Sequence, residues 1–567
     1  MKLKIRKEPV QADVLIVGGG ISGLQAAIAA GEKGAHVIVV EKADTRRSGC
    51  GATGNDHFMC YIPEYHGDDF QEILQEVCET LVGPKQDINV LTLMMRRSFE
   101  LVQKWDSYGI DMKPTGKWNF EGHAMPGRRR YHLKYDGHNQ KPVLTQKAKE
   151  YGAEIMNKTT IADLLIKDNK VVGAIGINAQ YDQPELVVFQ AKTAILATGV
   201  TTRVYPGVNP AFVCNTSCCP ADAGGIAIAY RAGARIVNMD QPGLNAGPLQ
   251  LARCGKATWI GVLTYANGKP VGPFVTKPTR ELGDVTSDIW QTVFDEKIAD
   301  GSGPVYMNCS QTSEEDLEHM REAFVSEGDT SINDYMDQYG IDLRKHMVEF
   351  GTYEYTIGGG EGIDIDLNSE TTVDGLYASG DLTGNVRGDI TSAAVFGQVA
   401  GECAADKCQT REFEEVLDMP IIKEKIDEYD SMLEREAGAH WLEVNSSLQQ
   451  IMEKYVSVKN IRSESLMKAG YKYLSDLKKY AIAQLKAENA HELVRSLEVL
   501  DLLDVSIIMA LCGENRKETR GVIKRVDYPF TNPLMNNKFQ IISLTEDGAV
   551  LGFRDKIKDQ NDQTLNH

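Results

Sequence analysis

Three glycines near the start of the chain have the spacing of a dinucleotide-binding turn. Gly18, Gly20 and Gly23 form G-x-G-x-x-G, and Glu41 follows 18 residues after the last of them. The first glycine allows a tight turn, the second lets a pyrophosphate approach the backbone, and the third lets a helix pack closely on a strand. The carboxylate of Glu41 could accept hydrogen bonds from a ribose.

The residues around this motif predict the strand–helix–strand unit that it needs. Residues 13–17 and 36–40 are short apolar runs typical of buried strands, and residues 24–30 predict a helix of small residues. The N-terminus of that helix would face the phosphates. A glycine motif alone is a weak signal, but here the strands, the helix and the acid all stand in the expected order.

A second segment, far along the chain, favours FAD over a nicotinamide cofactor. Residues 372–381 predict a strand that ends at Gly380 and Asp381, and residues 391–405 predict a helix of small residues. The aspartate could bind a ribityl hydroxyl. The helix N-terminus at Ser392 and Ala393 could face the electron-rich carbonyl side of a flavin through its dipole.

Two more stretches of small residues should lie against the same cofactor. One is the glycine- and serine-rich segment 46–55, and the other is the strand that ends at Gly199. Together with the motifs above they predict the following FAD-binding residues: Gly18, Gly20, Ile21, Ser22, Gly23, Glu41, Lys42, Ser48, Gly49, Gly51, Ala52, Gly54, Ala197, Thr198, Gly199, Gly380, Asp381, Ser392 and Ala393.

Length and composition indicate a multidomain globular protein. A chain of 567 residues is too long to fold around one compact core. Its content of 42% apolar and 25% charged residues is ordinary for a soluble protein. A net charge of −19, from 80 acids and 61 bases, disfavours nucleic acid or an anionic membrane as a partner. No apolar run approaches the ~18 residues of a membrane span, and no signal-peptide pattern precedes the first strand, so we expect a cytoplasmic protein.

The order of patterns predicts an α/β fold. We expect a doubly wound FAD-binding domain, an inserted α+β capping domain and a helical C-terminal domain. The predicted ranges are 1–234 and 350–408 for the FAD-binding domain, 235–349 for the capping domain, 409–515 for the helical domain and 516–567 for a C-terminal segment.

The 11 cysteines do not predict a metal site or an iron–sulfur cluster. They are scattered, without a C-x₂-C pair, and only Cys214, Cys218 and Cys219 lie close together. We expect these to be buried, reduced thiols, and a redox-active pair is the alternative. Electrons must therefore be exchanged with something outside the chain.

These motifs, taken in order, resemble the flavoprotein subunits of succinate dehydrogenase, fumarate reductase, L-aspartate oxidase and adenylylsulfate reductase. Shorter stretches, among them KWDSYGI and GSGPVYMN, are more similar to the adenylylsulfate reductase alpha subunit. The resemblance implies that the electron partner is a separate iron–sulfur subunit. The stretches that carry it are residues 13–42, AILATG at 194–199, DAGGIAIAYRAGA at 222–234, GLYASGD at 375–381 and TRGVIKRVDYP at 519–529. The resemblance also adds Asp222 to the predicted FAD-binding residues.

The chain departs from the succinate-type pattern at three places. Gly49 or Cys50 stands where those enzymes link a histidine to FAD, so we expect non-covalent FAD. Glu354 replaces the histidine of the dicarboxylate pocket. Ser287 and Asp288 replace the proton-donating arginine of fumarate reductases, with Arg280 seven residues before Ser287.

Four residues are the predicted catalytic group. Glu354, between two tyrosines at a glycine turn, is a candidate acid or base, and Arg387 in GNVRGD is a candidate anion-binding residue near the flavin. Arg253 should lie where the capping domain covers the flavin. Asn55 resembles the asparagine that faces substrate in adenylylsulfate reductases.

The prediction is thus an FAD-dependent oxidoreductase that transfers two electrons between flavin and a small anionic substrate, similar to the adenylylsulfate reductase alpha subunit. One alternative is a reductase of an enoate or dicarboxylate, similar to fumarate reductase or succinate dehydrogenase. Another is a flavin-bearing electron-transfer subunit without substrate turnover.

Overall fold

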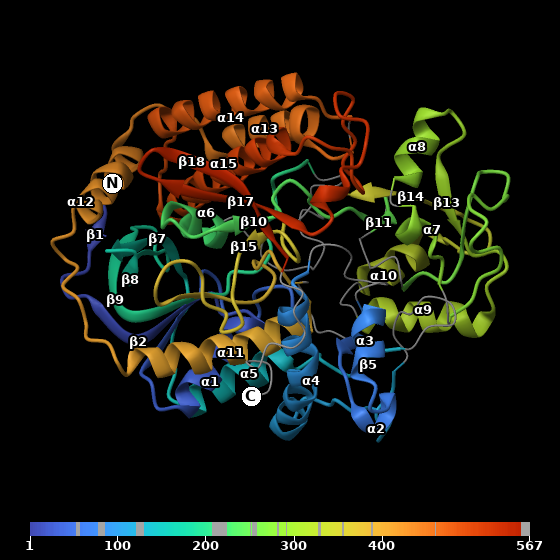
Figure 1. The fold of residues 1–567 in the computed structure, drawn as a ribbon, viewed down its shortest axis with the longest axis horizontal. Coiled ribbons are helices and arrows are strands. Elements are labelled where there is room, and N and C mark those ends of the chain that lie inside the picture. Colours follow the sequence, from blue (N-terminus) through green and yellow to red (C-terminus); the bar gives the residue numbers. More distant parts are fainter. Residues whose placement is uncertain are drawn as a thin grey trace.

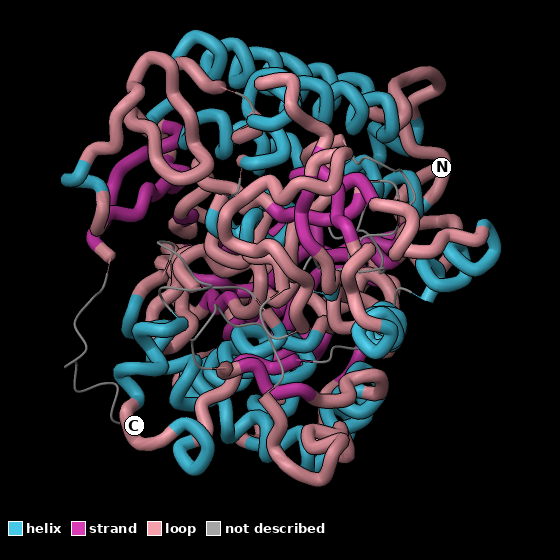
Figure 2. The backbone as a smooth tube through the Cα atoms, turned by 90° about the vertical axis from the view of Figure 1, so that its right-hand side faces the viewer, coloured by secondary structure: helices cyan, strands magenta, loops and turns pink. Residues whose placement is uncertain are grey.

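The computed structural model describes residues 1–52, 57–77, 86–120, 130–206, 224–249, 251, 258–280, 283–290, 292–326, 330–353, 357–386, 389–459 and 461–556. Figure 1 shows a sheet region at the left, a smaller lobe at the right and long helices along the top. Figure 2 shows the same helices along the top from a direction 90° away.

The largest sheet has eight strands and is built around β2 (Val10–Val17). The apolar run of β2 is buried, as expected for a strand covered on both faces. Its parallel neighbours are β3 (Val37–Val40) and β9 (Glu185–Leu196). On the outer side of β3 lies β6 (Glu154–Met156), and β16 (Leu376–Ala378) runs parallel to the end of β9.

The first half of β9 has one antiparallel neighbour. It pairs with β8 (Lys170–Asn178), which pairs with β7 (Thr159–Lys167), and β1 (Lys4–Ile5) also joins β9 in parallel. The strand order is β6-β3-β2-β9-β8-β7. Parallel strands linked by helices, with an antiparallel extension, confirm the predicted α/β class.

A group of helices lies together below the sheet in Figure 1. The extensive contact between α1 and α11 requires small residues. A Cβ on Gly397 would lie 2.5 Å from the Ser22 carbonyl oxygen, and one on Gly401 would lie 2.4 Å from the Ala26 carbonyl oxygen. The helices of this group are α1 (Ile21–Glu32), α4 (Ile88–Tyr108), α5 (Gln140–Glu150) and α11 (Ile390–Cys408).

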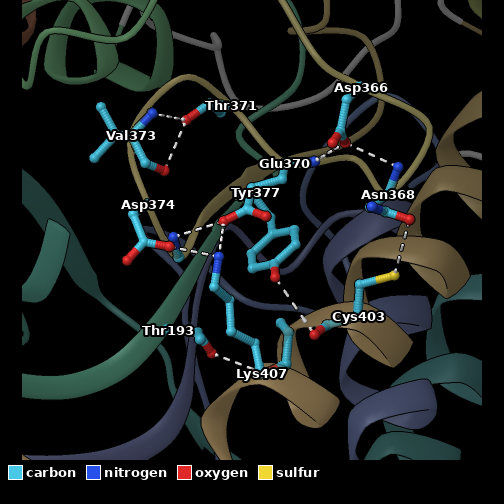
Figure 3. A network of polar contacts seen from close by, with 12 residues as sticks. Thr193, Asp366, Asn368, Glu370, Thr371, Val373, Asp374, Tyr377, Cys403 and Lys407 are labelled. Atoms are coloured by element: carbon cyan, nitrogen blue, oxygen red, sulfur yellow. Dashed lines mark hydrogen bonds and ion pairs between the residues drawn. The ribbon is translucent and has the colours of Figure 1, made fainter. Parts of the chain in front are cut away.

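Polar contacts anchor β16 to α11 (Figure 3). Lys407 of α11 forms ion pairs with Glu370 and, at 2.5 Å, with Asp374, both in the loop that leads to β16. The hydroxyl of Tyr377, within β16, donates to the Cys403 carbonyl oxygen at 3.4 Å. The strand that reaches Gly380 and Asp381 is therefore held by the helix that follows it.

The smaller lobe is an inserted α+β unit with its own apolar core around Trp259, Phe324 and Phe350. Lys524 lies 2.7 Å from Glu296 and joins this lobe to the C-terminal segment. Its four-stranded sheet has the order β11-β14-β13-β12. The elements of the lobe are β11 (Asn245–Pro248), β12 (Val262–Thr264), α7 (Thr286–Ile289), α8 (Val293–Ala299), β13 (Val305–Asn308), α9 (Glu314–Ser326), α10 (Thr330–Tyr339) and β14 (Val348–Tyr353).

The predicted helical region is present and centres on the largely buried helix α15. Arg231, the last residue of α6 (Gly224–Arg231), forms ion pairs with Asp163 of β7 and with Asp501 of α15, at 3.2 and 2.8 Å. The helices are α12 (Pro420–Glu434), α13 (Trp441–Ile451), the π-helix η4 (Met452–Val456), α14 (Glu464–Gln484) and α15 (Ala490–Asn515).

A third sheet joins the C-terminal hairpin to two strands from earlier in the chain. Its order is β15 (Gly362–Ile363), β10 (Ile236–Val237), β17 (Lys538–Thr545) and β18 (Gly548–Asp555). Arg554 in β18 lies 2.6 Å from Asp87 and 2.6 Å from Asp364. The remaining elements are β4 (His57–Met59), α2 (Pro63–His66), α3 (Phe70–Val77), β5 (His132–Lys134), α6 (Gly224–Arg231) and the 3₁₀ helix η5 (Pro533–Met535).

Within the described ranges, no helix combines the length and the apolar character needed to cross a bilayer.

We predict that Gly401→Ala lowers the free energy of unfolding by about 1–3 kcal/mol, because the new methyl group would collide with the Ala26 carbonyl oxygen and force α1 and α11 apart. Thermal unfolding followed by circular dichroism measures the change. Gly552→Ala is the control, since its added Cβ would meet nothing closer than 3.6 Å. Equal melting temperatures for the two variants would contradict the close packing.

Candidate functional site

A cavity opens where the parallel strands of the main sheet end. The carboxyl ends of β2, β3, β9 and β16 lead to Gly18, Glu41, Ala197 and Ser379, and all four residues line it. Ligands of α/β proteins bind at this edge of the sheet, where side chains and turns from several strands meet. Fifteen of the predicted cofactor residues line the cavity, namely Gly18, Gly20, Ile21, Ser22, Glu41, Lys42, Ser48, Gly49, Gly51, Ala197, Thr198, Gly199, Gly380, Asp381 and Ala393.

The turn after β2 can be formed only by glycine. Gly18 has φ +104°, and a Cβ there would lie 2.4 Å from the Ala197 carbonyl oxygen. A Cβ on Gly23 would lie 1.9 Å from the Gly18 carbonyl oxygen. Gly20 is the N-cap of α1, and among the described residues no side chain caps that helix. The amide groups of its first turn are therefore available to an anion.

Glu41 is held rigidly at the end of β3. Its Oε2 accepts a hydrogen bond from the Gly19 amide at 2.7 Å, and its Oε1 accepts one from the Ala43 amide at 2.8 Å. Each carboxylate oxygen can accept more than one hydrogen bond, so the group can also receive ribose hydroxyls.

Residues between Ser379 and Ala393 line the other side of the cavity. Ser22 and Ser379 join the two halves through a hydrogen bond of 2.6 Å between their hydroxyls. Asp389 and Ser392 form a capping box at the start of α11, with two hydrogen bonds of 3.0 Å. Because Asp389, Ile390 and Ala393 line the cavity, the positive end of the α11 dipole faces it. Ser392 acts as part of the cap rather than of the lining.

The lining fits a dinucleotide. The hydroxyl of Ser48, a residue only 4% exposed, has no hydrogen-bond partner in the described part of the chain, although it lies at the cavity. A buried hydroxyl of this kind indicates a missing polar ligand. Helix N-termini on both sides suit phosphate and carbonyl oxygens, while Val17, Val40 and Ile228 add apolar surface.

Lys141, at the start of α5, binds the backbone of the glycine turn. This lysine is 1% exposed, and its Nζ donates a hydrogen bond to the Gly19 carbonyl oxygen. Its neighbour Gln140 donates to the Gly51 carbonyl oxygen at 2.9 Å. The sequence predicted only a helix over residues 141–151, since a lysine in KPVLTQK has the pattern of a surface residue.

Several lining residues were not predicted. Thr159, Thr160 and Ile161 come from the start of β7, which the crossover from β3 through β6 brings to the cavity. No local motif marks them. The other unpredicted lining residues are Val17, Val40, Cys50, His57, Gly224, Ile228, Ser379, Asp389 and Ile390.

Two further predicted cofactor residues are described but do not line the cavity. Gly23 packs against Gly18, and Ala52 follows the lining residue Gly51.

The predicted catalytic residues Asn55, Arg253, Glu354 and Arg387 lie outside the described residues. The same holds for Gly54, Asp222, Cys214, Cys218 and Cys219.

Arg280 and Ser287, discussed for the proton-donor position, are described. Arg280 lies on the surface of the inserted lobe, 2.8 Å from Asp316 and 3.1 Å from Glu315. Ser287 is buried in α7.

The chain matches two protein-family models. One, described as "FAD binding domain", covers residues 13–390, and one described as "Fumarate reductase flavoprotein C-term" covers residues 445–554. The chain belongs to the succinate dehydrogenase and fumarate reductase flavoprotein family. FAD is therefore its cofactor, and the flavoprotein is an FAD-dependent oxidoreductase.

Known relatives of this flavoprotein are distant but match along almost its whole length. A fumarate reductase (CoM/CoB) polypeptide of Methanothermobacter marburgensis is 24% identical over 94% of this chain and 99% of its own. The fumarate reductase flavoprotein subunit of Escherichia coli is 24% identical over 91% of this chain and 88% of its own.

Two solved structures share the fold. Adenylylsulfate reductase from Archaeoglobus fulgidus has a TM-score of 0.83 at 20% identity, covering 98% of this chain and 97% of that one. A mutant of the quinol fumarate reductase flavoprotein from E. coli has a TM-score of 0.79 at 20% identity, covering 98% of each chain.

We predict that Lys141→Met weakens FAD binding by about tenfold or more, because the Gly19 carbonyl group loses a charged donor and the turn loses a nearby positive charge. Titration of the apoprotein with FAD, followed by flavin fluorescence, measures the affinity. Lys149→Met, on the exposed face of the same helix, is the control. Unchanged affinity in Lys141→Met would contradict this role.

Proposed function

We propose that this flavoprotein transfers two electrons between FAD and a small anionic substrate, as an adenylylsulfate reductase alpha-like protein. FAD, when bound, supplies reversible two-electron chemistry at its isoalloxazine ring. Gly18, Gly20 and the first turn of α1 would bind the pyrophosphate, and Glu41 the ribose. Asp381 and the N-terminus of α11 would hold the flavin end.

The substrate would be bound by residues that the sequence singles out. Asn55, Arg253 and Arg387 would orient the anion, and Glu354 would hold or release a proton at its carboxyl group. The inserted lobe would cover the reacting groups and exclude water, which strengthens these electrostatic contacts.

The observation that carries the choice of substrate class is the position of Arg280. It is the nearest arginine upstream of the site where fumarate reductases place their proton donor, yet its guanidinium pairs with Asp316 and Glu315. Ser287, at that site, cannot supply a positive charge. These two facts support a substrate other than fumarate.

Reduction of an enoate or dicarboxylate is the second candidate. The C-terminal family match and the fumarate reductase relatives favour it. A third possibility, an electron-transfer subunit without turnover, rests on the altered pocket residues.

We further propose that the electron partner is a separate iron–sulfur subunit. The scattered cysteines of this chain match no ferredoxin pattern. Electrons that reach the flavin must then cross to another polypeptide or to a diffusible carrier.

An anaerobic titration tests the proposal. We expect sulfite with AMP to bleach the oxidised flavin, and adenylylsulfate to reoxidise the reduced flavin, because a cationic pocket would bind both anions. Fumarate and other enoates should leave the reduced flavin unchanged. Absorbance of the flavin measures each step.

Variants of the same protein sharpen the test. Arg387→Met should abolish both the bleaching by sulfite with AMP and the reoxidation by adenylylsulfate. Arg280→Met should preserve both. Reoxidation by fumarate that disappears in Arg280→Met would establish the second candidate, and no response to any compound would favour the electron-transfer subunit.

We also propose that FAD is held non-covalently, since Gly49 and Cys50 stand at the position of the linked histidine. Acid precipitation of the purified protein should release the yellow colour into the supernatant. Colour that stays in the pellet would contradict this expectation and point to His57, the histidine among the lining residues.

A further inference from the structure

A second cavity, of about 360 Å³, lies beside the ribose end of the dinucleotide site. We call it the outer cavity. Lys42 and Thr160 line both cavities, so the two adjoin each other. One wall comes from the main sheet and its loops, and the other comes from α15 of the helical region. The lining residues used below are Lys42, Lys158, Thr160, His491, Arg495 and Glu498.

Positive charge exceeds negative charge around this cavity. Among its described lining residues, Lys42, Lys158 and Arg495 carry permanent positive charges, whereas Glu498 is the single carboxylate. His491 adds a further cation when protonated. This excess is unusual in a chain whose net charge is −19.

The single negative charge of Glu498 cannot neutralise the cations of this cavity, because three cations share it. Its side chain is 2% exposed and lies 3.2 Å from Lys42, 2.8 Å from Arg203 and 2.6 Å from Arg495. Burial alone would raise the pKa of Glu498, but the three cations outweigh it and lower the pKa to about 2. The carboxylate is therefore ionised at neutral pH and still leaves an excess of positive charge.

Lys42 and Arg495 are partly buried, and their contacts with Glu498 hold them in place at the cavity wall. Their side chains are only 24% and 20% exposed. Lys158 and His491 stand at the exposed rim. An excess of partly buried cations over anions favours a bound anion, since burial strengthens the attraction between charges.

We propose that the outer cavity binds a phosphate-class oxyanion, either as free phosphate or as the phosphate of a mononucleotide. Arg495 and Lys42 would meet the oxyanion from inside and Lys158 from the rim, with the Thr160 hydroxyl as a neutral donor. Since Lys42 belongs to both cavities, the oxyanion and FAD influence each other's affinity reciprocally.

Calorimetric titration of the FAD-loaded full-length protein tests the site, with FAD filling the main cavity. The double variant described below distinguishes AMP bound at the outer cavity from AMP bound at the proposed substrate pocket. The probes are sodium phosphate, AMP and adenosine. We expect saturable binding of phosphate or AMP that weakens with added salt, and no binding of adenosine. Only the binding that the double variant weakens belongs to the outer cavity. In that component, tighter binding of AMP than of phosphate would identify a mononucleotide, and equal binding would identify free phosphate.

The double variant Lys158→Gln/His491→Gln should bind the same probe about tenfold more weakly. Lys158→Arg should retain binding, and Lys479→Gln, on the exposed face of α14, should behave as the wild type. Flavin absorbance and thermal unfolding show that each variant is folded. Absence of saturable phosphate and AMP binding, equal affinity in the double variant, or binding of adenosine would overturn the proposal.

Discussion

A hydrogen bond between two serines 357 residues apart is the contact on which the dinucleotide site depends. Ser22 lies in the first turn of α1, and Ser379 directly follows β16 and precedes Gly380. Their hydroxyls meet at 2.6 Å, next to the packed glycines of α11. If α1 and α11 were separated by one larger side chain, the two helix N-termini could no longer face the same cavity.

Charged pairs set the position of the other layers relative to this pair of helices. Arg231 joins the main sheet to α15, and Arg554 joins the C-terminal hairpin to Asp87 and Asp364. Buried pairs of this kind add little net stability because desolvation offsets their attraction. Removal of either arginine, however, would take a shared cation away from two buried carboxylates. The pairs therefore restrict how the layers can pack.

The glycine turn and the late Gly-Asp segment could be predicted because backbone geometry demands their residue types. Gly18 accepts no Cβ, and this requirement is visible in the sequence itself. Thr160 and Lys141 could not be predicted in the same way. Their types are common on surfaces. Thr160 reaches the cavity only through a crossover, and Lys141 reaches the glycine turn only through the packing of α5. The outer cavity could not be predicted either, because its walls come from segments more than 300 residues apart.

The third sheet bears on how the protein is made. β10 is flanked by β15 and β17, and β9 receives its neighbour β16 from a segment translated long after it. A ribosome that has released only the first half of the polypeptide leaves these strand edges open. Open edges invite association with other chains, so the nascent protein needs protection until its last hairpin emerges. Because Ser379, Gly380, Asp381, Asp389, Ile390 and Ala393 line the cavity, the complete FAD site exists only after these residues have been translated.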